Sequence, residues 1–241
     1  IDLQNNGGGS IEEAIRLAGM FIDQGPFSIL VNNKDDQIIL QNEYEGSLYN
    51  GPIVLLMNGH SASASELFAA AIQDYSRGLI IGSTSLGKAT MQSIASLNTA
   101  KEESFVKVTI EKFYRITGES NQIKGVIPDV ALPALFDSII PREKSYATAF
   151  KNESIIPKIR FKPMQNNHFS QLITLSNTRV KNSAVFNKIR MANEEINALY
   201  NNPKKPTRLA FTDVFEDVHE NDSLWNQFKK IVNRESNFTL S

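Results

Sequence analysis

The run Gly59-His60-Ser61-Ala62-Ser63-Ala64-Ser65-Glu66 joins two segments that decide the fold. Before it, Ile53-Val54-Leu55-Leu56-Met57 is continuously apolar and as long as a typical strand, which predicts a buried parallel strand. After it, apolar residues recur at helical spacing up to Tyr75 and predict a helix. Small residues between a buried strand and a helix can form a sharp turn, and such a turn can hold a nucleophilic side chain.

Similar patterns extend the prediction on both sides of this unit. Ser10 is a good N-cap for a helix over 10–22, and Gly25-Pro26 ends it. A β-hairpin turn is predicted at 33–36. The predicted strands are 1–4, 27–31, 37–41, 53–57, 79–82, 90–97 and 105–116. This order favours an α/β domain with a mainly parallel sheet and some hairpin additions.

The character of the sequence changes near Pro133. Prolines recur from there to Pro206 and break the chain into short pieces. Helices are predicted at 183–200 and around 224–231. We therefore expect a core over 1–135 and a mostly helical accessory region over 136–241.

Composition excludes several classes of protein. Apolar residues make up 41% and charged residues 21%, which is typical of a globular chain. A net charge of −1 and a pI of about 6.4 give no sign of nucleic acid or an acidic membrane surface as a partner. No apolar run reaches the roughly 20 residues of a membrane span. Without cysteine the chain has no disulfides, no thiolate metal ligands and no cysteine nucleophile.

No metal site is predicted either, because the histidines are far apart in sequence. They are His60, His168 and His219. Ile1 has the character of the middle of a strand, so we expect the chain to be a fragment of a longer protein. The lack of a signal peptide therefore carries no information about export.

Ser63 and Lys88 together suggest a Ser/Lys hydrolase. Serine must lose its proton as it attacks, and an unperturbed lysine is only roughly 0.04% neutral at pH 7. A lysine that accepts this proton must be desolvated and kept away from carboxylates. The neighbours of Lys88, from Leu86 to Met91, carry no charge, which suits this role.

Each of these features also has a structural interpretation. Ser63 with Glu66 matches a capping box, in which the serine hydroxyl bonds a backbone N–H. Ser61 is an alternative cap, which would free Ser63. His60 beside Ser61 is a candidate general base, although adjacent residues on a turn rarely face one another. Lys88 is alternatively a solvated surface lysine, and the three glycines at 7–9 a flexible turn.

Four segments occur in an order that is more specific than any one of them. They are Asp2-Leu3-Gln4-Asn5-Asn6-Gly7-Gly8-Gly9, Ser61 to Glu66, Gly87-Lys88-Ala89-Thr90-Met91-Gln92 and Lys124-Gly125-Val126-Ile127-Pro128-Asp129. Together they resemble the C-terminal processing peptidases, also called tail-specific proteases, over residues 1–133. The stretches 68–75 and 113–115 look most like the Prc/Tsp branch of Gram-negative bacteria. The region after 133 resembles the helical C-terminal domain of that branch more loosely, chiefly at 137–139 and 183–200.

This resemblance assigns roles to individual residues. The family's nucleophile falls on Ser63 and its general base on Lys88. Its glutamine falls on Gln92, where an amide can aim the lysine amine as the third member of a triad aims a histidine.

The resemblance also implies an oxyanion hole of backbone N–H groups. We expect the N–H of Ala64 and that of a loop glycine, Gly7 or Gly8. Asp74 matches an acidic position of the family. We expect it to be structural, because a carboxylate beside Lys88 would raise the pKa of that amine.

The resemblance further implies a Clp-protease/crotonase-like fold, present here in part, and a serine endopeptidase that selects proteins by apolar C-terminal tails. It implies a periplasmic location, with inner-membrane association as a variant, and an adaptor protein or an oligomer as further partners. No metal or cofactor is implied. The family's PDZ domain and first catalytic strands lie outside this segment.

Two other functions stay open from the sequence. The chain has Gln4, Ser83-Thr84 and Ala89 where the family commonly has Arg, Glu-Pro and Gly, which leaves room for a non-catalytic scaffold that binds tails or a partner. A crotonase-like acyl-CoA enzyme would need a carboxylate beside the serine turn for its acid/base chemistry. No such carboxylate is evident in the sequence.

Overall fold

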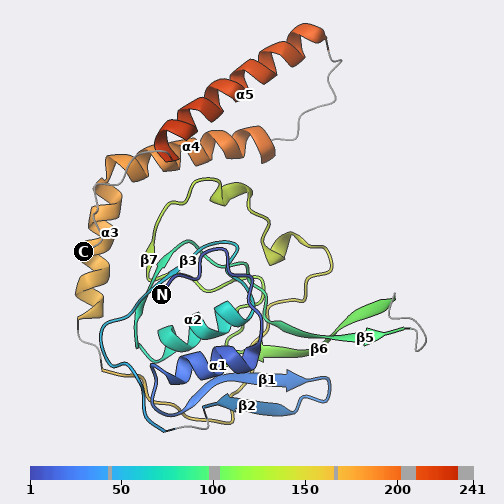
Figure 1. Ribbon diagram of the computed structural model, residues 1–241, viewed down its shortest axis with the longest axis vertical. Coiled ribbons are helices and arrows are strands. Elements are labelled where there is room, and N and C mark those ends of the chain that lie inside the picture. The colour runs from blue at the N-terminus through green and yellow to red at the C-terminus, as the bar shows by residue number, and fades with distance from the viewer. Residues whose placement is uncertain (43–44, 98–103, 166–167, 202–209, 233–241) are drawn as a thin grey trace.

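The computed structural model describes residues 1–42, 45–97, 104–165, 168–201 and 210–232 (Figure 1). Its helices are α1 (Ile11–Gly19), α2 (Ala64–Asp74), α3 (Phe169–Asn182), α4 (Ala184–Asn201) and α5 (Phe211–Val232). Its strands are β1 (Pro26–Asn32), β2 (Gln37–Gln41), β3 (Val54–Met57), β4 (Leu79–Gly82), β5 (Thr90–Ser96), β6 (Phe105–Tyr114) and β7 (Val130–Ala131). Two short 3-10 helices, η1 (Asp137–Ile139) and η2 (Glu143–Ser145), follow β7.

The predicted α/β class is confirmed, but the prediction of one mainly parallel sheet is wrong. The strands form two sheets, a parallel one in the order β3-β4-β7 and an antiparallel one in the order β2-β1-β6-β5. Strands β1 and β2, like β5 and β6, follow each other without a helix between them. Such short connections join antiparallel neighbours, whereas parallel neighbours need a long crossover. Residues 1–4 contribute a single parallel bridge, from Asp2 to Leu56.

A β-α-β unit positions the serine turn. Strand β3 pairs in parallel with β4, Val54 opposite Leu79 and Met57 opposite Gly82, and α2 makes the crossover between them. Every residue of α2 from Ala64 to Ile72 is buried, including the polar Ser65 and Glu66 of its first turn. Ser63 therefore sits after the carboxyl end of β3 and at the amino end of a buried helix.

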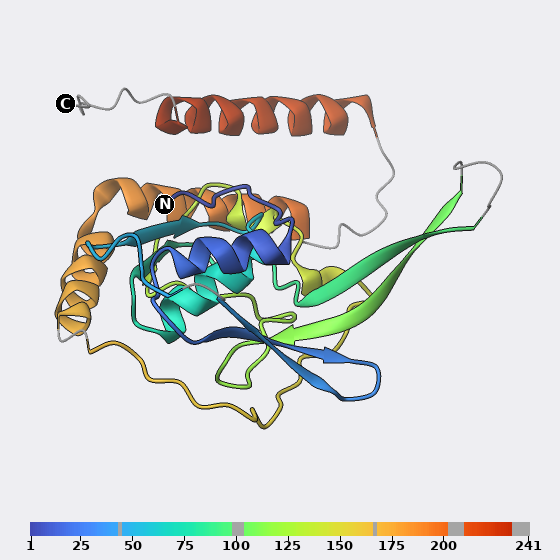
Figure 2. The same ribbon diagram turned by 60° about the horizontal axis from the view of Figure 1, so that its bottom comes forward.

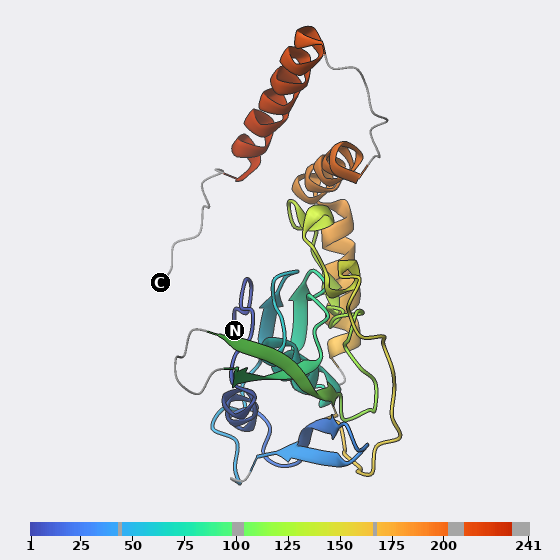
Figure 3. The same ribbon diagram turned by 90° about the vertical axis from the view of Figure 1, so that its right-hand side faces the viewer.

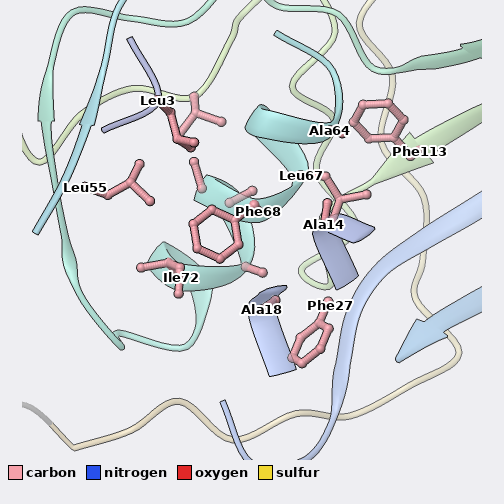
Figure 4. Packing of buried hydrophobic residues seen from close by; sticks show 14 of the residues in the cluster. Leu3, Ala14, Ala18, Phe27, Leu55, Ala64, Leu67, Phe68, Ile72 and Phe113 are labelled. Atoms are coloured by element: carbon pink, nitrogen blue, oxygen red, sulfur yellow. The ribbon is translucent and has the colours of Figure 1, made fainter. Parts of the chain in front are cut away.

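The hydrophobic core lies between α1, α2 and the strands of both sheets (Figure 4). Small residues of α1, Ala14 and Ala18, face α2 and let the two helices approach closely. Phe68 and Ile72 are the largest fully buried side chains of α2, along with Leu67. Leu55, Phe27 and Phe113 complete the cluster from β3, β1 and β6. Because α2 is held on all sides, the turn at its amino end has a fixed position.

Strands β5 and β6 extend beyond the core as a long two-stranded arm (Figure 2). The burial of β5 falls along its length, from Thr90 (buried) to the exposed residues 93–96. The end of β5 nearest the core carries Gln92 and begins two residues after Lys88.

The chain after β7 has two parts that contact the core differently. Residues 150–164 run along the core as an extended segment, with the Ile155 N–H bonded to the Gly118 carbonyl and the Met164 N–H to the Tyr75 carbonyl, both at 2.9 Å. Helices α3 and α4 lie along one side of the molecule and α5 lies beyond them (Figure 3). Helix α4 packs Ala192 and Ile196 on residues 135–139.

The predicted helices at 183–200 and 224–231 are confirmed as α4 and part of α5. Helix α3 was not predicted, and none of its residues is buried. The division of the chain at residue 135 stays a prediction. Within the described ranges, no helix combines the length and the apolar character that crossing a membrane requires.

Candidate active site

Ser63 has an unusual backbone conformation, with φ 58° and ψ −117°. A sparsely populated backbone conformation of this kind costs about 1–3 kcal/mol, and such conformations cluster at functional sites. Ser63 and Glu66 have the arrangement of a capping box, although the Ser63 hydroxyl makes no cap hydrogen bond to the helix. The Glu66 N–H donates instead to the Ser63 carbonyl oxygen, at 2.9 Å. The hydrogen bond that closes this capping box runs from the Ser63 N–H to the Glu66 carboxylate.

The neighbouring polar residues of the turn have other roles. Ser61 is fully buried, and its hydroxyl donates to the Leu3 carbonyl at 2.7 Å and accepts from the Asn58 N–H at 3.0 Å. These bonds tie the start of the chain to the turn. His60 is exposed, and its backbone N–H donates to Asn58 Oδ1 at 3.1 Å. Ser65 is buried at the first turn of α2.

Glu66 is the central polar residue of the site, and its carboxylate accepts four hydrogen bonds. Oε2 accepts from the Ser63 N–H at 2.8 Å and from the Lys88 N–H at 2.9 Å. Oε1 accepts from the Gly87 N–H at 2.8 Å and from the Ser85 hydroxyl. Burial raises the pKa of Glu66 to about 6, and these four hydrogen bonds oppose that effect. One buried carboxylate thus joins the serine turn to the lysine loop.

This role of Glu66 was not predicted, and no carboxylate was expected beside the serine turn. Glu66 corrects that view, because it lies there with 0% of its surface exposed. Its only sequence signal is the capping-box position three residues after Ser63. Since its oxygens already accept from protein donors, Glu66 does not resemble the acid/base carboxylate of an acyl-CoA enzyme.

Lys88 is partly buried at the end of the loop that leads into β5. Its Nζ donates to Gln92 Oε1 at 3.4 Å, so these two predicted site residues are in contact. Burial lowers the pKa of Lys88, and the positive charge of Lys107 lowers it further, whereas Glu143 and Glu66 act in the opposite direction. Within the described part of the chain, no hydrogen bond joins Lys88 Nζ to the Ser63 hydroxyl.

The glycine loop lies directly against the serine turn. Gly8 has φ 94°, and a Cβ added to it would lie 2.6 Å from the Ala62 carbonyl oxygen and 2.8 Å from the Ala64 nitrogen. The loop needs glycine at this position for both reasons. The Gly8 N–H donates to Asn6 Oδ1 at 2.9 Å, and the space around the Gly7 Cα is open.

A small cavity of about 190 Å³ opens between the glycine loop and the two helices. Gly8 and Ala64 line it at the turn, and Ala14, Leu17 and Phe68 form an apolar wall. Of the three predicted oxyanion residues, Gly8 and Ala64 thus border this cavity.

Asp74 lies at the far end of α2 from Ser63 and forms an ion pair with Arg115. The Arg115 Nε donates to both carboxylate oxygens of Asp74, at 3.0 and 3.2 Å, and the Asp74 side chain is 4% exposed. Burial raises the pKa of Asp74, and Arg115 opposes this effect. These contacts support the predicted structural role.

Comparison with known proteins gives one consistent relationship. The sequence profile of peptidase family S41 matches residues 1–132. The tail-specific protease of Haemophilus influenzae is 41% identical over 144 residues, which are 57% of this chain and 21% of that protein. The carboxy-terminal-processing protease of Bartonella bacilliformis is 35% identical over 133 residues, 55% of this chain and 30% of that protein.

Among solved structures, the photosystem II D1 C-terminal processing protease matches with 33% identity and a TM-score of 0.49. The match covers 54% of this chain and 33% of that one. The chain thus spans between 21% and 30% of the length of the two curated relatives above.

Proposed function

This chain belongs to peptidase family S41, and on that premise we propose that it carries the nucleophile and the general base of a serine endopeptidase. Ser63 attacks the scissile carbonyl while Lys88 takes the hydroxyl proton. Lys88 then gives the proton to the leaving amine, and water hydrolyses the acyl-enzyme with Lys88 again as the base.

One observation carries this proposal: a single oxygen of Glu66 binds the backbone N–H groups of both Ser63 and Lys88. A shared acceptor keeps the two main chains within a few ångströms of each other. In a site without substrate, catalytic hydrogen bonds are often long and tighten only in the complex. We infer that substrate binding brings the Ser63 hydroxyl within reach of the Lys88 amine.

The surroundings of Lys88 favour the neutral amine that a base requires. Burial removes water from the ammonium form and lowers the pKa of Lys88. The Gln92 amide oxygen accepts from Nζ at 3.4 Å and restricts the direction of the amine. Asp74 is the carboxylate that would raise the pKa of Lys88 if it lay beside that amine. It forms an ion pair with Arg115 at the other end of α2 instead.

For the oxyanion hole we propose the N–H of Ala64 and that of a loop glycine. Ala64 is the first residue of α2, where N–H groups have no intrahelical partner and the helix dipole favours negative charge. Gly7 and Gly8 are the two candidates for the second donor. Gly8 would have to exchange its bond to Asn6 for one to the substrate oxygen.

We propose that the substrates are proteins chosen by apolar C-terminal tails and that the protein works in the periplasm, with or without inner-membrane association. This follows the relationship to the tail-specific protease of Haemophilus influenzae, which is 41% identical to this chain over 144 residues. An adaptor protein or an oligomer is a further partner in this proposal.

The test is cleavage of casein and of a substrate with an apolar C-terminal tag. We expect Ser63→Ala and Lys88→Ala to abolish turnover and Lys124→Ala, an exposed lysine, to retain it. A fluorophosphonate probe followed by peptide mapping identifies the acylated serine, and we expect Ser63 rather than Ser61. Undiminished cleavage by Lys88→Ala would overturn the Ser/Lys mechanism.

A further inference from the structure

The segment that leads from the core to the helical region reaches back to the lysine loop. Asn193 of α4 holds its beginning, accepting from the Phe136 N–H at 2.9 Å and donating to the Ala134 carbonyl at 2.8 Å. Asp137 then accepts from the Ser83 hydroxyl at 2.6 Å and from Arg142 Nη2 at 2.7 Å. These contacts fix residues 134–142 against the chain just before Lys88.

The same segment continues into a clamp on the lysine loop itself. The Glu143 N–H donates to the Leu86 carbonyl at 3.0 Å, on one side of Lys88. On the other side, the Ala89 N–H donates to Gln122 Oε1 at 2.8 Å. Gln122 Nε2 closes the ring by donating to Glu143 Oε1 at 3.1 Å.

The clamp is a built feature rather than a surface contact. Gln122 is 3% exposed, and both ends of its amide are used, one by Ala89 and one by Glu143. Ala89 is 1% exposed, so its N–H has no access to water in place of Gln122. Removing the amide would leave a buried donor unpaired.

Charged groups face Lys88 from three other elements. Glu66 approaches from α2, Lys107 from β6 and Glu143 from η2. Glu66 already binds four donors, and Lys107 is exposed on the arm. Like Glu66, Glu143 combines a charge that acts on the Lys88 amine with a hydrogen bond that holds the Lys88 loop, and Glu143 does so from the segment that follows the core.

Resting on the function proposed above, we propose that Gln122 and Glu143 are positioning residues for Lys88. They hold its loop from both sides, and the charge of Glu143 favours the protonated form of its amine. The seating of residues 134–143 on α4 therefore influences how readily Lys88 acts as a base. Neither residue needs to touch the substrate in this role.

Substitutions separate the hydrogen bond from the charge. Glu143→Gln keeps an oxygen that accepts from Gln122 and removes the charge. We expect the acid limb of its kcat/KM profile to move to lower pH, with a roughly two- to fivefold gain on that limb at low ionic strength. Because the charge effect is screened by salt, the gain should shrink in 1 M NaCl.

Gln122→Ala breaks the clamp and leaves the charge in place. We expect kcat to fall roughly ten- to hundredfold, because the loop that carries the base loses its fixed position. The acid limb of the kcat/KM profile of Gln122→Ala should not move to lower pH, in contrast to that of Glu143→Gln. Glu119→Gln is the matched control, since it removes a carboxylate from an exposed ion pair with Lys124.

A direct titration distinguishes this inference from the proposed function. Lysine labelled with ¹³C at Cε reports the titration of Lys88 by NMR, with Lys88→Arg to assign the signal, whether or not the sample cleaves substrate. A lower midpoint in Glu143→Gln than in the parent supports the inference, and an unchanged midpoint overturns it. Cleavage that survives Lys88→Ala overturns the proposed function instead, and the NMR result still decides the role of Glu143.

Discussion

Replacing Glu66 by glutamine tests the central contact of the site. The carboxylate accepts from four donors, two on each oxygen. A glutamine offers one oxygen and one NH₂ group, so two of the four donors would face another donor. Each buried donor left unpaired costs about 1–3 kcal/mol, which gives a loss of about 2–6 kcal/mol.

The cost of burying an ionised carboxylate reduces this loss of stability at neutral pH. Burial raises the pKa of Glu66 from 4.5 to about 6, so keeping it ionised in the folded protein at pH 7 costs about 2 kcal/mol. A neutral glutamine avoids that cost. We therefore expect Glu66→Gln to lower the free energy of unfolding at pH 7 by about 2 kcal/mol, measured by urea denaturation.

The pH dependence gives the sharper test. Since the pKa of Glu66 is higher in the folded than in the unfolded chain, its stabilising contribution is complete below pH 4.5 and is lost as the pH rises through about 6. The parent therefore gains about 2 kcal/mol relative to the variant between pH 7 and pH 4.5. Glu119→Gln, on the surface, should show no such difference. Equal stability of parent and Glu66→Gln at both pH values would refute this reasoning.

Three further predictions follow from individual contacts. Gly8→Ala places a Cβ 2.6 Å from the Ala62 carbonyl at a φ of 94°, so peptidase activity should fall sharply, whereas Gly9→Ala, with open space around it, should retain activity in the same cleavage assay. Asp74→Ala leaves Arg115 without its buried partner and should cost about 3–5 kcal/mol in thermal or urea unfolding; a loss below 1 kcal/mol would contradict a buried ion pair. Because the pKa of Lys88 is lowered, the acid limb of kcat/KM should lie below pH 10.5, and a limb at that ordinary lysine value would exclude Lys88 as a desolvated base.

Local patterns were enough to predict the elements that form the site. The apolar run at 53–57 and the helical repeat after it gave β3 and α2, because period and length depend only on neighbouring residues. Helix α1 ends at Gly19 rather than at 22, since Met20 already forms the C-cap. Helix α3 was not predicted, because none of its residues is buried and its sequence therefore needs no apolar stripe.

The residue types indicated the class of reaction but did not show which polar groups surround the reactive side chains. A serine at a strand-to-helix turn and a lysine without charged neighbours indicated the nucleophile and the base, and their order with the glycine loop indicated the family. The sequence left Ser63 between a cap and a nucleophile, because both interpretations need the same residue at the same place. In the structure Ser63 keeps the capping-box arrangement with Glu66, while its hydroxyl makes no cap hydrogen bond to the helix.

Only the tertiary structure decided which distant groups meet. Two sheets form instead of one, because strand pairing depends on which edges the connections bring together. Glu66 binds Ser63 and Lys88, and Gln122 binds Ala89, through contacts between residues that lie far apart along the chain. A local sequence pattern cannot predict such contacts, because the partners of a buried carboxylate or amide depend on which donors lie near it in the folded protein. The sequence thus determined the elements and the reactive residue types, and the packed core determined which polar groups hold them in place.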